Sequence, residues 1–103
     1  MDAPVRELQR MDDLHRQGRE RLAAGRPQDA IAAAEEALTL EPDNVRSLTL
    51  KADALEALGR DADLEALRQR IRLLRREAWQ RAVEAELRGH HDLLGEAIRH
   101  EQL

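Results

Sequence analysis

The feature that most constrains this chain is a match with itself at an offset of 34 residues. At that offset residues 23–30 align with residues 57–64, and Leu14 aligns with Leu48. A chain that repeats at this period is built from copies of one small supersecondary unit, and each copy exposes an apolar face that its neighbour covers. The repeat therefore predicts an array of stacked units.

Glycine and proline mark the ends of the predicted helices. Gly25 suits the left-handed residue that follows a helix, and Gly59 stands at the equivalent place 34 residues later. Pro27 suits the first position of a helix, whereas Pro42 cannot continue one. We expect helices from Pro4 to near residue 24, from Pro27 to the stop at residues 41–42, over about 45–58, and from residue 61 onward.

No helix-breaking residue occurs between Asp61 and Gly89. We expect one long helix there, or two helices joined by a subtle bend. The sequence Gly89-His90-His91-Asp92 predicts a break, followed by a short last helix over about 92–101. This last helix would carry Leu93, Leu94, Ala97 and Ile98.

Composition favours an all-α chain. One Trp, no Phe and no Tyr leave the core to Leu, Ile, Val, Met and Ala, and strand-favouring residues are scarce. The lack of cysteine excludes disulfides and thiolate ligands. Charged residues make up 37% of the chain, the apolar runs are short and no signal peptide is visible, so we expect a cytoplasmic protein that does not enter a membrane.

The first repeat, residues 11–44, carries small and apolar residues at fixed positions: Leu14, Gly18, Gly25, Ala30, Ala34, Ala37, Leu38 and Pro42. This pattern resembles the tetratricopeptide repeat family, which often has Trp where Leu14 stands. The second repeat, residues 45–78, is degenerate. It keeps Leu48, Ala52, Gly59 and Leu64 but has Arg68 and Arg76 where an apolar residue and a proline are usual.

The resemblance implies one domain over residues 1–103: a right-handed array of antiparallel helix pairs with a C-terminal helical cap at residues 79–103. It also implies a protein–protein interaction module, a scaffold or adaptor that binds a peptide or helix of a partner protein in its concave groove. The first helix of each repeat would line that groove with Asp12, His15, Arg19, Leu22, Arg46, Thr49, Asp53 and Glu56. Arg19 and Arg46 are candidate anchors for a carboxylate. Family members that bind chaperones hold the C-terminal carboxylate of the chaperone with a Lys/Asn clamp. This chain lacks that clamp, so we do not expect it to bind chaperones in that way.

The alternative function is self-assembly. Trp79, Val83 and Leu87 form an apolar stripe at four-residue spacing. This stripe either covers the last repeat, is covered by the final segment, or mediates a homodimer.

Other binding functions are less favoured. The arginines at positions 68, 70, 72, 75 and 76 are flanked by acids, the net charge is −4 and stacking aromatics are lacking, so nucleic acid is not the expected partner. A metal site would use His90, His91, Asp92, Glu96 and His100, but adjacent histidines diverge on a helix, and we expect no metal or other cofactor. No nucleophile–base arrangement or phosphate-binding loop stands out, so we expect no enzyme.

Overall fold

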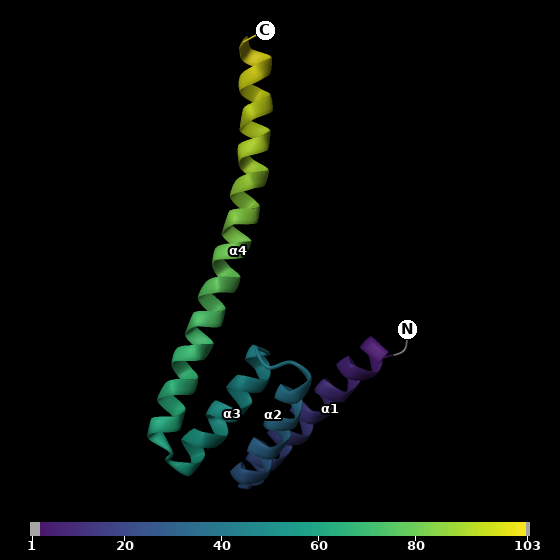
Figure 1. Ribbon diagram of the computed structural model, residues 1–103, viewed down its shortest axis with the longest axis vertical. Helices are drawn as coiled ribbons and strands as arrows, with labels where there is room; N and C mark the ends of the chain where they lie inside the picture. The colour runs from purple at the N-terminus through teal and green to yellow at the C-terminus, as the bar shows by residue number, and fades with distance from the viewer. Residues whose placement is uncertain (1–2, 103) are drawn as a thin grey trace. The chain divides into compact units, whose positions relative to one another are not determined.

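The chain folds into helices throughout the part that its computed structural model describes, which is the backbone of residues 3–102 and the side chains of residues 5–89. The helices are α1 (Ala3–Ala23), α2 (Pro27–Leu40), α3 (Val45–Leu58) and α4 (Asp61–Gln102) (Figure 1). The predicted all-α class is confirmed. Two compact units follow one another along the chain, one that runs to Arg72 and one that begins at Leu73. Among the described residues, no helix has the length and apolar composition needed to cross a membrane.

The turns after α1 and α3 have the same geometry. Gly25 and Gly59 both adopt left-handed backbone conformations, with φ of +75° and +70°. The Gly25 amide donates to the Leu22 carbonyl at 3.1 Å, and the Gly59 amide donates to the Glu56 carbonyl at 3.0 Å. A glycine satisfies this conformation without the steric strain of a Cβ atom. The expectation that both glycines end helices is confirmed.

Local signals also fix the starts of α2 and α3. Pro27 is the first residue of α2, where its missing amide hydrogen is not needed. Asn44 precedes α3, and its side-chain oxygen accepts a hydrogen bond from the Ser47 amide at 2.9 Å. Such a cap pairs one of the helix amides that lack an intrahelical acceptor.

Helix α2 packs against both α1 and α3 through small residues (Figure 1). Four alanines of α2 are fully buried: Ala30, Ala33, Ala34 and Ala37. Because alanine adds little bulk, larger side chains of the neighbouring helices fill the space between them. The buried leucines and other large residues of this core are Met11 and Leu14 of α1, Leu48, Leu50 and Leu55 of α3, and Leu64 and Ile71 of α4.

The predicted break at Gly89 is wrong. Helix α4 continues through this residue to Gln102, so no separate helix forms over residues 92–101. A glycine inside a helix costs about 1 kcal/mol relative to alanine, which is too little to stop a helix. Gly89 does not have the positive φ of Gly25 and Gly59, and Leu, Glu, Arg and Ala around it favour the helix.

The apolar residues of α4 form two stripes on different sides of the helix. Leu64, Leu67, Ile71 and Leu74 follow one another at three- and four-residue steps, and Leu64 and Ile71 are buried. Trp79, Val83 and Leu87 form the second stripe, which is displaced by roughly 140° at 3.6 residues per turn. Trp79 is 65% exposed and Leu87 is 61% exposed.

Candidate interaction surface on α1 and α3

Four of the eight predicted groove residues pair with one another between α1 and α3. Arg19 Nη1 lies 2.6 Å from Asp53 Oδ2, and Arg46 Nη1 lies 3.1 Å from Asp12 Oδ1. In both pairs the partners are 34 residues apart, so each ion pair joins equivalent positions of the two repeats. The two helices therefore form one continuous surface, with ion pairs two helical turns apart along it.

The charges of these two ion pairs stay in contact with solvent. Their side chains retain between 41% and 74% of their exposure. Exposed ion pairs contribute about 0–1 kcal/mol to stability and are weakened by salt. Each pair can consequently open at a small energetic cost, which leaves its charges available to other charged groups.

His15 lies beneath this surface. We expect it among the exposed groove residues, but the structure leaves it only 3% exposed. Its Nε2 atom is 2.5 Å from Ser47 Oγ, and the Ser47 hydroxyl donates to Asn44 Oδ1 at 3.1 Å. Because the hydroxyl hydrogen is directed to Asn44, we assign the imidazole hydrogen to Nε2, which donates to Ser47 Oγ. The chain of hydrogen bonds connects α1 to the capped start of α3.

The second ring nitrogen of His15, Nδ1, is buried and makes no hydrogen bond within the described part of the chain. Burial lowers the pKa of His15 below 6.5, the nearby Arg46 and Arg19 cations lower it further, and Asp12 acts in the opposite direction. A proton on Nδ1 would be a buried donor without an acceptor, so the neutral ring is favoured.

The His15–Ser47 pair resembles the contact of a general base with a hydroxyl nucleophile. However, Ser47 is fully buried, and its hydroxyl hydrogen is engaged by Asn44. The pair therefore serves as a link between helices. The sequence reasoning missed this role of Ser47, although Asn44 three residues earlier is the signal of a helix cap that places Ser47 in the first turn.

The other predicted groove residues take no part in the two ion pairs. The Thr49 hydroxyl donates to the Val45 carbonyl of its own helix at 2.7 Å, and Leu22 is half-buried. Glu56 accepts a hydrogen bond from Arg68 of α4 at 3.3 Å. Two further arginines of the series at positions 68–76 are also paired: Arg70 with Asp43 and Arg72 with Glu65.

Gly18 sets how closely α1 approaches α3. A Cβ atom at this position would overlap with Cδ2 of Leu50 and would lie 3.3 Å from its Cγ. Gly18 is one of the small residues at fixed positions of the first repeat, and the side chain that it accommodates belongs to α3. Leu50 is buried, so it has little room to move aside.

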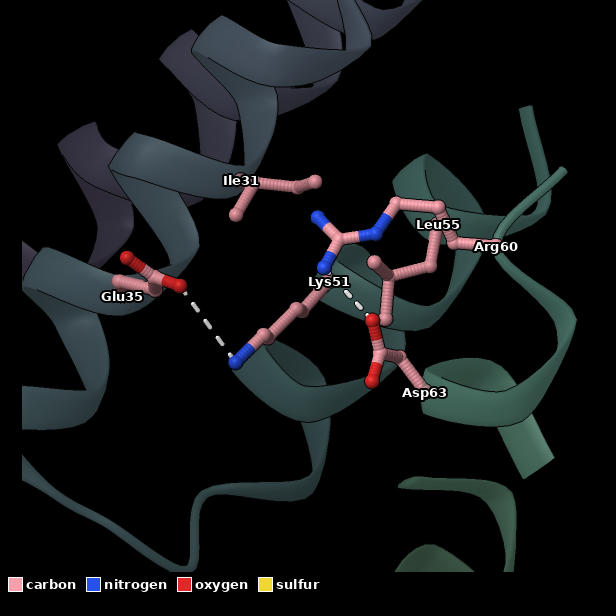
Figure 2. Close-up of a pocket in the computed structure, with 6 residues that line it drawn as sticks. All are labelled: Ile31, Glu35, Lys51, Leu55, Arg60 and Asp63. Atoms are coloured by element: carbon pink, nitrogen blue, oxygen red, sulfur yellow. Dashed lines mark hydrogen bonds and ion pairs between the residues drawn. The ribbon is translucent and has the colours of Figure 1, made fainter. Parts of the chain in front are cut away.

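A small pocket of about 220 Å³ lies beside α2 and α3 and extends to the start of α4 (Figure 2). Ile31 and Leu55 supply its apolar side chains. Lys51 Nζ lies 3.5 Å from Glu35 Oε1, and Arg60 Nη2 lies 2.6 Å from Asp63 Oδ2. Since each cation already faces a carboxylate, an anion entering this pocket would compete with groups of the protein.

Among the residues whose side chains are described, no group of three His, Asp or Glu residues is arranged to hold a metal ion. The histidine-rich segment singled out above, from His90 to His100, lies outside those residues, as do Leu93, Leu94 and Ile98. Comparison with protein-family models, with curated proteins and with solved structures finds no match to this chain.

Proposed function

We propose that this protein is an interaction module that binds a peptide or helix of another protein on the surface formed by α1 and α3. The observation that carries this function is the pairing of equivalent residues across the two helices, Arg19 with Asp53 and Arg46 with Asp12. In this proposal the helix pairs are tetratricopeptide-like, and the chain acts by binding rather than by catalysis.

The chemistry of the surface favours a partner that carries both signs of charge. Asp12 and Arg19 are two turns apart on α1, and Arg46 and Asp53 are two turns apart on α3 with the opposite order of signs. A partner carboxylate can bind Arg19 or Arg46, and a partner cation can bind Asp12 or Asp53. Such contacts determine specificity and orientation more than affinity, so apolar contacts must contribute much of the binding free energy.

An exchange of charges tests the proposal without removing the ion pair. The double variant Asp12→Arg/Arg46→Asp keeps the net charge and an ion pair between α1 and α3, but it reverses the pattern that a partner meets. A matched control is Arg10→Glu/Glu36→Arg, which exchanges another exposed interhelical pair, between α1 and α2. Both variants should retain the circular dichroism spectrum and melting temperature of the parent.

The measurement is affinity capture from an extract of the native organism, followed by titration of each captured protein. We expect the Asp12→Arg/Arg46→Asp variant to bind at least about tenfold more weakly than the parent, which corresponds to 1.4 kcal/mol. The control should bind as the parent does. Captured proteins that bind the exchanged variant with parental affinity would rule out this surface as their binding site.

A further inference from the structure

A second apolar surface lies on the opposite end of α1 from the turn at Gly25. A pocket of about 370 Å³ is lined there by Leu8 and Met11 of α1, by Leu40 of α2, and by the carboxylate residues Glu7 and Glu41. Leu8 is 65% exposed, and Val5, one turn before it, is exposed as well. Pockets of about 300–1,000 Å³ accommodate ligand groups, and exposed apolar patches of this kind mark interaction sites. We call this surface the α1–α2 pocket.

The second apolar stripe of α4, consisting of Trp79, Val83 and Leu87, has the complementary properties. It spans nine residues, with a rise of about 12 Å from Trp79 to Leu87. Arg76 lies three residues and Arg75 four residues before Trp79, and neither has an ion-pair partner within the described residues. Glu86 flanks the other end of the stripe, beside Leu87. A helix with a narrow apolar stripe is the usual occupant of an apolar groove. We call this surface the α4 stripe.

The rim of the pocket is acidic, and the Trp79 end of the stripe is flanked by arginines. Glu7 and Glu41 lie beside the pocket, and neither forms an ion pair within the part of the chain that the structure describes. Arg75 and Arg76, at the Trp79 end of the stripe, are cationic and exposed. The carboxylates at the pocket favour an apolar helix that brings such arginines beside them, as the Trp79 end of the stripe does.

We propose that the α4 stripe of one molecule binds in the α1–α2 pocket of a second copy of this chain, and that the second copy returns the same contact. The reciprocal arrangement has two-fold symmetry and closes after two molecules. It also buries the contact twice, which matters because a single large aromatic side chain covers only about 150–250 Å² and stable interfaces are several times larger. This self-association uses surfaces other than the α1–α3 surface and does not depend on the proposed partner binding.

The test compares the mass of the full chain by sedimentation equilibrium over a range of concentrations. The parent mass should rise with concentration from 11.7 kDa toward twice that value and no further. Leu8→Gln alters the pocket and Leu87→Gln alters the stripe. Both side chains are exposed, so the fold should survive, as circular dichroism can verify. Leu73→Gln is the matched control, because Leu73 is also exposed on α4 but lies outside the stripe.

We expect Leu8→Gln and Leu87→Gln each to weaken association at least about tenfold, and Leu73→Gln to leave it unchanged. An equimolar mixture of Leu8→Gln and Leu87→Gln should associate more strongly than either variant alone, because one intact stripe then meets one intact pocket. Arg76→Glu should weaken association, and raising the salt concentration should weaken the parent.

Three results would overturn the reciprocal contact. A parent that stays monomeric at all concentrations would show that no second copy binds. Loss of association with Leu87→Gln but not with Leu8→Gln would indicate stripes that pack on each other. A parent mass that grows beyond two molecules would show that the contact does not close.

Discussion

Helix α4 contains two regions that differ in what surrounds their apolar side chains. Leu64 and Ile71, in the unit that ends at Arg72, are buried, whereas Trp79 and Leu87, in the unit that begins at Leu73, are exposed. The backbone is helical in both regions. The comparison shows that helix formation in this chain does not require burial, because strong helix formers recur in both regions of α4. The burial of apolar side chains instead determines which helical segments pack together into one unit.

The largest expected difference between the two units concerns the removal of a large side chain. Leu14 is 1% exposed, and Leu14→Ala should lower the free energy of unfolding by about 2–5 kcal/mol because it leaves a cavity in the core. Trp79→Ala should change it by no more than about 0.5 kcal/mol in dilute solution. Urea denaturation followed by circular dichroism measures both values. Similar losses for the two variants would mean that Trp79 is packed in the protein.

Replacing glycine by alanine should have opposite effects in the two units. Gly18→Ala should destabilise the first unit by about 1 kcal/mol net, because overlap with Leu50 costs about 1–3 kcal/mol and the gain in helix propensity offsets part of it. Gly89→Ala meets no atom within 4 Å and should stabilise the local helix by up to about 1 kcal/mol. Thermal melting reports the first change, and hydrogen exchange of the amides around residue 89 reports the second. A higher melting temperature for Gly18→Ala would contradict the close approach of α1 and α3.

Acidification should weaken the first unit through His15. Its pKa is lowered in the folded state, so the unfolded chain takes up a proton first as the pH falls below 6.5. The free energy of unfolding should fall from that pH down to the lowered folded pKa, by at most about 1.4 kcal/mol per pH unit, and stay level below it. Urea denaturation between pH 7.5 and 5.5, in roughly the range where histidine titrates, measures this slope. His15→Gln should remove the His15 contribution, and an unchanged slope in that variant would assign the effect to other groups.

The smallest expected effect is the coupling between Asp12 and Arg46. A double-mutant cycle with Asp12→Asn and Arg46→Gln should give an interaction energy of about 0.2–1 kcal/mol at low ionic strength. The coupling should fall toward zero in about 1 M salt, where the screening length is about 3 Å. A coupling that is zero at both salt concentrations would mean that the two side chains do not meet.

The features of the fold that local chemistry determines could be predicted from the sequence. Gly25, Gly59 and Pro27 act on the backbone of their own neighbourhood, and the helix ends at these residues agree with the prediction. Gly89 was predicted wrongly by the same rule. Gly89 does not adopt the left-handed backbone conformation of Gly25 and Gly59, and the spacing of residues does not reveal which conformation a glycine adopts.

The candidate surface on α1 and α3 could be predicted only in part, because burial depends on contacts between residues that are distant in the sequence. The resemblance to the tetratricopeptide repeat led us to expect Asp12, Arg19, Arg46 and Asp53 on one surface, and these four residues form two ion pairs between α1 and α3. The burial of His15 could not be predicted, since it depends on a hydroxyl group of another helix that lies 32 residues away. Helical spacing predicts which face of a helix a residue lies on. Whether that residue is buried depends on how much of the face is covered by the neighbouring helix.

The contact between α1 and α3 is measured most directly by nuclear Overhauser effects in the labelled full chain. We predict cross-peaks between the Hα atoms of Gly18 and the methyl groups of Leu50, and between the His15 ring and the Hβ atoms of Ser47. Both pairs link α1 to α3 and are absent from any single helical hairpin. If Leu50 methyl groups show contacts to α2 but none to Gly18, the two helices do not form one surface, and the binding site proposed for a partner does not exist.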